Sequence, residues 1–196
     1  MEPSEILFKS STAVGPKAFT KDGNILLYHE LVSEKGFDIH IYDMGIEESR
    51  PFLNGNFDER KPYFSPDDKW VVYESNESGI LEIYATDFPN KTIKKQISSL
   101  GGYEPMWSHK GDRIFYRKKD DFYVVNVETS DEITFSKPEI LLSGKSRYRP
   151  GWGRYYDLSP DEKHFVAVKE IIPDPTFNSL NVITNFFEEV KQKTGK

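Results

Sequence analysis

Cysteine is absent from the 196 residues of this chain. Disulfide bonds and thiol chemistry are therefore excluded. Long apolar runs are absent too, and the opening residues Met1 to Glu5 carry neither a basic region nor an apolar stretch. We therefore predict no signal peptide and no transmembrane helix. As written, the sequence predicts a cytoplasmic protein, or a periplasmic one if an export segment has been removed.

An excess of positive charge is also missing. The chain has 26 Lys and Arg against 32 Asp and Glu, a net charge of -6 and a pI near 5.3. Nucleic-acid binders usually carry a basic surface, so we predict neither a nucleic-acid nor a membrane partner. Aromatic residues make up 14% of the chain, which favours strands over helices.

Catalytic motifs are lacking as well. The four histidines form no His-x-x-x-His pair, and the chain has neither a Gly-x-Ser-x-Gly elbow nor a phosphate-binding glycine loop. Gly151-Trp152-Gly153 has no following lysine and is interpreted as a kink. His29 and His40 end adjacent predicted strands, which leaves a metal pair there as an alternative. We predict no catalytic residue, no metal and no cofactor.

What the chain does contain is a repeated unit of strand, polar turn and strand. Its hydroxyl residues are Thr20, Ser65, Ser108 and Ser159, separated by 45, 43 and 51 residues. The four copies are Ala18–Tyr28, Tyr63–Tyr73, Met106–Tyr116 and Asp157–Ala167. A repeat of about 40 to 50 residues that contains several short strands is the signature of a β-propeller blade.

The residues after each hydroxyl are turn formers, such as Asp22-Gly23 and Pro66-Asp67-Asp68. A serine followed by an aspartate could also be a nucleophile with its orienting acid. A catalytic serine would not recur once per blade, however. We therefore interpret the hydroxyls as turn residues that bond nearby backbone.

The repeat predicts an all-β fold, a propeller of four four-stranded blades in a single domain over residues 1–196. The predicted blades span about 15–55, 59–99, 102–145 and 149–185, followed by a C-terminal extension at 186–196 that we expect to form a short helix. Blade four lacks a fourth strand. The opening segment Glu5–Ser10 resembles the last strand of blade three, Glu139–Gly144. We therefore expect residues 5–10 to close the last blade, within one chain or across a dimer.

The repeat unit reads Pro-x-(Phe/Trp)-Ser-x-Asp-(Gly/Asp)-(Lys/Arg)-x-(Val/Ile)-x-(Tyr/Phe), matched best by Pro62–Tyr73 and Pro105–Tyr116. This unit resembles the TolB-type, WD-like propeller repeat of bacterial proteins. Nearly the whole chain is similar to the C-terminal half of propellers attached to bacterial serine/threonine kinases. Family members usually have more blades, and every kinase motif is missing here. The resemblance implies a platform that binds a ligand or a protein.

Function in propellers usually lies where the first strands converge on the central channel. The loops that lead into those strands are rich in arginine and aromatic residues, which anchor many interfaces. We predict a mouth for an anionic or peptide ligand lined by Arg60, Lys61, Tyr103, Glu104, Tyr148, Arg149 and Trp152. The alternative is that these loops are solvent-exposed entry loops that bind no ligand.

Two function classes stay open. The leading prediction is a non-enzymatic module for protein interaction or ligand sensing. The alternative is a propeller-type carbohydrate-active enzyme, such as a metal-dependent lyase, or the accessory propeller of a peptidase. For assembly, four blades close alone, or two chains form an eight-bladed homodimeric ring. We favour the dimer, because burying the aromatic flanks of an open half-ring stabilises each large side chain by roughly 1.5–3 kcal/mol.

Overall fold

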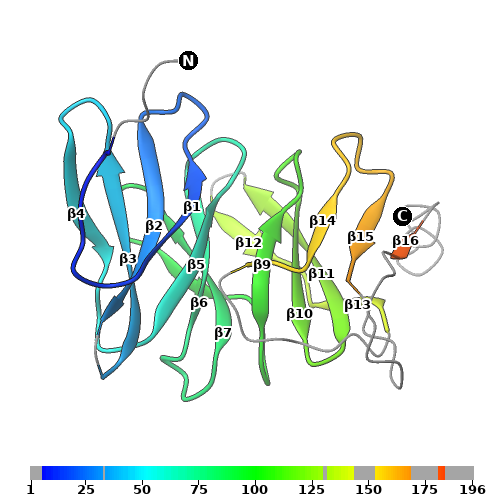
Figure 1. Ribbon diagram of the computed structural model, residues 1–196. Helices are drawn as coiled ribbons and strands as arrows, with labels where there is room; N and C mark the ends of the chain where they lie inside the picture. Colours follow the sequence, from blue (N-terminus) through cyan, green and yellow to red (C-terminus); the bar gives the residue numbers. More distant parts are fainter. Residues whose placement is uncertain (1–5, 33, 130–131, 144–152, 169–180, 184–196) are drawn as a thin grey trace, which may run out of the picture.

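The computed structural model describes residues 6–32, 34–129, 132–143, 153–168 and 181–183, and in them every regular element is a β-strand. The strands form four antiparallel sheets, which we name blades one to four. They follow one another from left to right in Figure 1. Among the described residues we find no helix with the length and hydropathy that crossing a bilayer requires.

Blades one, two and four are meanders, in which every strand pairs with the next along the chain, whereas in blade three β12 and β13 both pair with β11. Blade one contains β1 (Val14–Phe19), β2 (Ile25–Val32), β3 (Gly36–Asp43) and β4 (Glu48–Leu53). Blade two contains β5 (Glu59–Phe64), β6 (Trp70–Ser75), β7 (Glu82–Asp87) and β8 (Lys94–Gln96). Blade three contains β9 (Tyr103–Trp107), β10 (Arg113–Lys118), β11 (Asp121–Thr129), β12 (Ile133–Phe135) and β13 (Glu139–Leu142). Blade four contains β14 (Tyr156–Leu158), β15 (Phe165–Ala167) and β16 (Asn181–Ile183). The predicted all-β class is therefore confirmed.

The cores lie between neighbouring blades. Leu27 and Ile41 of blade one pack with Val71 and Tyr73 of blade two. Val72 and Ile83 of blade two pack in turn with Ile114 and Val125 of blade three. Phe115 and Phe122 of blade three pack with Tyr156 and Phe165 of blade four. Both faces of a central sheet are thus buried, which explains why strands such as Trp70-Val71-Val72-Tyr73 are apolar without alternation.

The turn between the first two strands has the same backbone-to-hydroxyl hydrogen bond in all four blades. In blade two, the Ser65 hydroxyl accepts a bond from the Trp70 N–H (3.0 Å) and donates one to the Asp67 carboxylate (2.6 Å). Thr20 and Ser159 make the equivalent pairs of contacts, and Ser108 accepts the same backbone bond but donates to the Asp112 carboxylate, four residues on. Each hydroxyl is therefore engaged in holding its turn, as its recurrence predicted.

The third turn residue after each hydroxyl has a positive φ, namely Gly23, Asp68, Gly111 and Glu162. Asp68 and Glu162 lack the freedom of glycine, but their side chains bridge to the preceding blade. The Asp68 carboxylate accepts a bond from the Lys21 N–H (2.8 Å), and Glu162 accepts one from the Lys110 N–H (3.2 Å). We infer that these contacts offset the cost of the left-handed backbone.

The expected pairing of the N-terminal segment with blade four of the same chain is wrong for residues 6–10. They form no strand, and Ile6 and Leu7 are 71% and 40% exposed. Phe8 instead packs on Tyr28 (ring centroids 5.0 Å apart) and on Tyr42 (5.4 Å), on blade one. The physical reason is that blade one has an apolar outer flank within reach, formed by Leu26, Tyr28 and Tyr42.

Polar contacts fix the same segment. The hydroxyls of Ser10 and Thr12 both donate to the Glu30 carboxylate, at 2.6 and 2.7 Å, and the Tyr42 hydroxyl donates to the Leu7 carbonyl (3.2 Å). Pairing of this segment with a second copy is not tested by a single chain. The short helix expected in the C-terminal extension at 186–196 lies outside the described residues.

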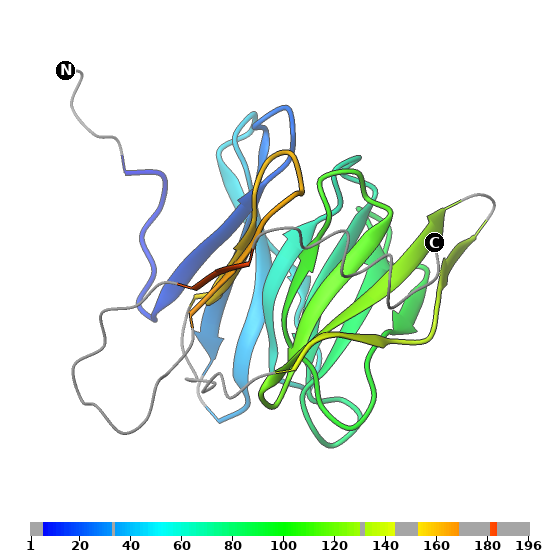
Figure 2. The same ribbon diagram turned by 90° about the vertical axis from the view of Figure 1, so that its right-hand side faces the viewer.

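Blade three has one element that the repeat did not predict. The distal end of β11 pairs with β12, while its proximal part pairs with β13, the predicted fourth strand. The resulting β11–β12 hairpin projects from the body of the protein in Figure 2. Blade four has three described strands, and β16 pairs with β15 on one side.

We expect Ser65→Ala to lower the free energy of unfolding by about 1–2 kcal/mol, because the buried turn loses two hydrogen bonds. Urea denaturation measures the effect. Ser78→Ala, in the exposed β6–β7 hairpin, is the matched control and should change little. Equal effects of the two substitutions would contradict the role given to the repeated hydroxyl.

Candidate functional site

The site begins with a bulge in each of the inner strands β1, β5 and β9. Lys61 in β5 and Glu104 in β9 both have positive φ, 51° and 57°, and both lie four residues before the turn serine of their blade. The register of each strand shifts at this point, as it does in β1 between Pro16 and Ala18. A bulge re-aims the side chains around it. In β5 and β9 the bulge accompanies burial of the Lys61 and Glu104 side chains.

Lys61 and Glu104 belong to a buried charge cluster, which we define as Lys61, Glu74, Glu104 and Arg117. All four are 1% exposed or less. Lys61 Nζ lies 3.2 Å from Glu74 Oε1 and 4.0 Å from Glu104 Oε1, and Arg117 Nη1 lies 3.8 Å from Glu104 Oε2. The Glu104 N–H donates to the Glu74 carboxylate (2.6 Å). Two cations thus face two carboxylates where blades two and three meet.

Glu104 also contacts blade four. Its carboxylate accepts a bond from the Tyr155 N–H (3.4 Å), and its carbonyl accepts one from the Tyr156 hydroxyl, which also contacts the Phe115 carbonyl (3.1 Å). Burial raises the pKa of Glu104, an effect opposed by the nearby Lys61 and Arg117. Glu104 therefore connects blades two, three and four.

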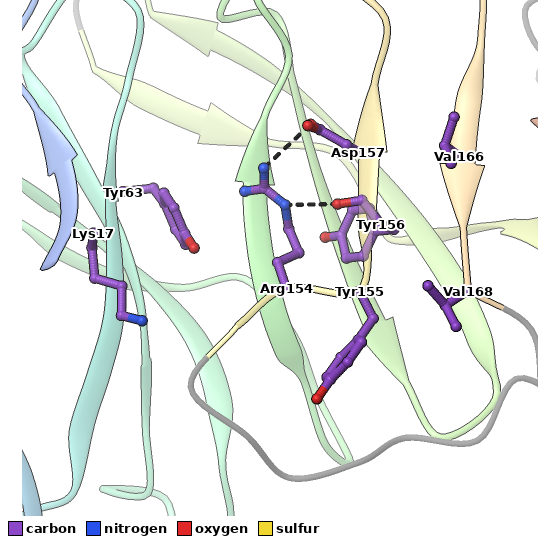
Figure 3. A pocket seen from close by; sticks show the side chains of 8 residues that line it. All are labelled: Lys17, Tyr63, Arg154, Tyr155, Tyr156, Asp157, Val166 and Val168. Atoms are coloured by element: carbon purple, nitrogen blue, oxygen red, sulfur yellow. Dashed lines mark hydrogen bonds and ion pairs between the residues drawn. The ribbon is translucent and has the colours of Figure 1, made fainter. Parts of the chain in front are cut away.

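Beside this cluster, the inner strands enclose a groove of about 500 Å³. We name it the axial groove, and it is lined by Lys17, Tyr63, Arg154, Tyr155, Tyr156, Asp157, Val166 and Val168. Figure 3 shows Lys17 and Tyr63 on one side, from β1 and β5, and the remaining residues, from β14, β15 and the residues flanking them, on the other.

Arg154 lies at the centre of the axial groove. Its Nε donates to the Tyr156 carbonyl (2.9 Å), and its Nη2 lies 3.3 Å from Asp157 Oδ1. The guanidinium also lies over the Tyr63 ring, 5.0 Å from the centroid. A smaller cavity of about 290 Å³ shares Tyr63, Arg154 and Asp157 and reaches Met106 and His109. These contacts bring blade four against blade two and hold the arginine in place.

His29 lies close behind Lys61, whose N–H is 3.5 Å from His29 Nδ1, and stacks on Phe37 with ring centroids 4.4 Å apart. Burial, followed by the charges of Lys17, Lys61 and Arg60, lowers the pKa of His29 from 6.5 to about 3. The imidazole is therefore neutral at physiological pH. Burial and Lys61 also lower the pKa of Lys17. Positive charge is concentrated on this side of the inner strands.

Four of the seven predicted site residues lie in the part of the chain that the structure describes. Lys61 and Glu104 are in the buried charge cluster. Arg60 is half-buried and pairs with Glu74 (2.9 Å) and Asp58 (3.5 Å), while Tyr103 is half-buried at the start of β9. Tyr148, Arg149 and Trp152 lie outside the described residues. The ligand role of this set stays a prediction.

The sequence-based prediction included none of the residues that line the axial groove, among them Lys17, Tyr63, Arg154 and Tyr155. Two signals could have found them. Lys17 lies three residues before the first turn hydroxyl, Thr20, and Arg154 and Tyr155 continue the arginine and aromatic run that begins at Tyr148. No comparable signal in the sequence marks Tyr63, because the direction of its side chain depends on the bulge at Lys61.

The histidine pair proposed as a metal alternative is divided between two faces of a sheet. His29 lies opposite Ile39, and His40 lies opposite Tyr28, so the two imidazoles point to opposite sides of blade one. His40 stacks on Tyr28, with centroids 5.3 Å apart, and lies 3.7 Å from Glu30. The described part of the chain contains no group of three or more His, Asp or Glu that could hold a metal ion.

Consecutive small antiparallel sheets packed face to face, with inner strands around a groove, define a β-propeller protein. Solved structures confirm this class. TolB from Acinetobacter baumannii superposes with a TM-score of 0.65 at 17% identity, over 93% of this chain and 43% of that one. The β-propeller domain of the Trilobed protease from Pyrococcus furiosus, described as having an open velcro topology, gives 0.53 at 17% identity, over 86% and 52%.

An oligogalacturonate lyase in complex with manganese gives a TM-score of 0.59 at 14% identity, over 84% of this chain and 47% of that one. No protein-family profile and no curated protein matches the sequence. The chain spans about half the length of the solved structures it matches, 51% and 43% for two TolB structures. At these identities the likeness shows the fold, with TolB-type propellers among the neighbours.

We expect the stability of the protein to fall as the pH drops below 6.5, partly because of His29. The unfolded chain protonates this residue near pH 6.5, whereas the folded chain keeps it neutral to about pH 3. Between pH 7 and pH 4.5 the loss should be roughly 2–3 kcal/mol larger in the wild type than in His29→Gln. Urea denaturation at the two pH values measures it, and equal losses would contradict a buried neutral histidine.

Proposed function

We propose that the protein is a non-enzymatic binding module, for protein interaction or ligand sensing, and that the axial groove is its binding surface. The observation that carries the proposal is the lining of the groove, where Lys17, Tyr63, Arg154 and Tyr155 surround an open volume of about 500 Å³. Arginine and tyrosine dominate binding hot spots, and the volume is within the range of ligand sites.

The chemistry of the described residues favours binding over catalysis. The serine–aspartate pairs that resemble nucleophile and acid are engaged in turns, with the Ser65 hydroxyl bonded to the Trp70 N–H. The lyase alternative needs a metal, and the division of His29 and His40 between two faces gives it no support. Metal analysis of the purified protein distinguishes the alternatives, because a lyase requires a bound ion and a binding module does not.

We expect Val168→Glu to abolish co-purification of partners that the wild-type protein retains. Val168 is 48% exposed and lines the groove, so a longer charged side chain would enter the binding volume. Recovery of each partner, measured by quantitative mass spectrometry, should fall at least tenfold. Ile46→Glu is the matched control, because Ile46 is 62% exposed in the turn between β3 and β4. Unchanged recovery with Val168→Glu would contradict the proposal.

We also propose that two copies complete one ring. The support is the arrangement of the cores: apolar cores join blade one to two, two to three and three to four, whereas the apolar cluster on the outer flank of blade one packs against no other blade among the described residues. In blade four, β16 pairs with β15 on one side, and no described strand pairs with its other side.

Light scattering tests the assembly. We expect a mass twice the 22.7 kDa of the chain, because dimerisation would bury the flanks of two half-rings. Phe8→Ala should leave the dimer intact if residues 6–10 contact only blade one of their own chain. A mass of 22.7 kDa at all concentrations would contradict the dimer, and it would leave the groove proposal standing.

A further inference from the structure

The residue directly before each turn hydroxyl holds the same place in all four blades. These residues are Phe19, Phe64, Trp107 and Leu158. In blades two, three and four this side chain is 9%, 6% and 6% exposed, and it packs in the core shared with the preceding blade. The Phe19 side chain, in blade one, is 51% exposed. The blade that has no preceding blade among the described residues therefore presents this aromatic ring to solvent.

Phe19 belongs to the outer flank of blade one. It lies directly opposite Leu26 in the pairing of β1 with β2, and directly opposed residues point to the same face of a sheet. Its neighbour Ala18 points to the other face and packs against the core shared with blade two. The outer flank thus extends from Tyr42 in β3 across Tyr28 and Leu26 in β2 to Phe19 in β1.

Blade four has the complementary flank. The seventh residue after the hydroxyl is Leu27 in blade one, Val72 in blade two and Phe115 in blade three, and each is fully buried against the blade that follows. The equivalent Val166 of blade four is only half-buried. Among the described residues, one end of the chain therefore lacks a preceding blade and the other end lacks a following blade. A second copy would supply both through two equal contacts.

Residues 6–10 cover part of the outer flank of blade one, along which they run in Figure 1. Phe8 packs on Tyr28, with ring centroids 5.0 Å apart. The residues equivalent to Tyr28 in blades two and three are Tyr73 and Tyr116, and both pack in the core shared with the preceding blade. Phe8 therefore lies where the rest of the protein places a neighbouring blade.

We infer that the outer flank of blade one binds blade four of a second copy, and that residues 6–12 cover part of this flank and are displaced when the copy binds. The inference rests on the proposed dimer, since it assigns the contact surface and a segment that regulates access to it. The hydroxyls of Ser10 and Thr12, both exposed, hold the segment on the Glu30 carboxylate. Release costs little, because water replaces these hydrogen bonds.

Sedimentation velocity over a concentration series tests the contact surface. Phe19→Glu would place a charge in an apolar contact and should raise the dissociation constant of the dimer at least tenfold. Phe57→Glu is the matched control, because Phe57 is 39% exposed in the loop between β4 and β5, and it should leave the constant unchanged. Phe19 does not line the axial groove, so its replacement leaves the groove residues as they are.

Two variants test the cover. Phe8→Ala, and Ser10→Ala combined with Thr12→Ala, each remove contacts that hold residues 6–12 on blade one. Each should lower the dissociation constant at least threefold, because the flank is then free in a larger fraction of the molecules. The double variant changes exposed side chains only, so it tests the cover even if the thermal midpoint shows that Phe8→Ala is unfolded.

The outcomes separate this inference from the proposed dimer. A dimer that Phe19→Glu leaves as tight as the wild type would overturn the contact surface and leave the dimer standing. Unchanged or higher dissociation constants in the cover variants would overturn the role of residues 6–12. A wild-type mass of 22.7 kDa at all concentrations would overturn the dimer itself, and this inference with it.

Discussion

The carboxylate and backbone of Glu104 hold the inner ends of three blades together. The side chain faces Lys61 of blade two and Arg117 of blade three, and it accepts a hydrogen bond from Tyr155 beside blade four. Burying these charges is costly, and removal of one member of a buried ion pair typically destabilises a protein by about 3–5 kcal/mol. The apolar cores between blades determine that the sheets stack. We infer that the buried charge cluster, whose members must face one another, helps to fix the register in which the inner strands meet.

The axial groove is a consequence of that arrangement. Glu74 and Glu104 are buried and pair with Lys61 and Arg117, and the charge of Glu74 also acts on Lys17 at the edge of the groove. Lys17 and Arg154 remain at the surface of the inner strands, beside two tyrosines and an apolar wall. Structural ion pairs and a candidate binding surface thus use the same strands, but their side chains point in different directions because of the bulges at Lys61 and Glu104.

Much of the fold was predictable because it repeats. The spacing from Thr20 to Ser159 located the turns and most strands, and each hydroxyl accepts the same backbone hydrogen bond in the structure. Burial of Lys61 and Glu104 was not predictable, since charged residues in loops are usually solvated and nothing in one sequence reveals a bulge. The position of Phe8 depends on which of two apolar surfaces it packs against, and this is decided by tertiary structure. The resemblance of Glu5–Ser10 to Glu139–Gly144 could not decide it.

Native-state hydrogen exchange tests most directly whether Glu104 couples the blades. In the wild-type protein, the amides of β15 in blade four should open with the same free energy as those of β10 in blade three, because the blades unfold together. In Glu104→Gln, the β15 amides should exchange at least tenfold faster, while amides of β3 in blade one keep their protection. Unchanged exchange of β15 in Glu104→Gln would show that the apolar cores alone unite the blades, contrary to this account.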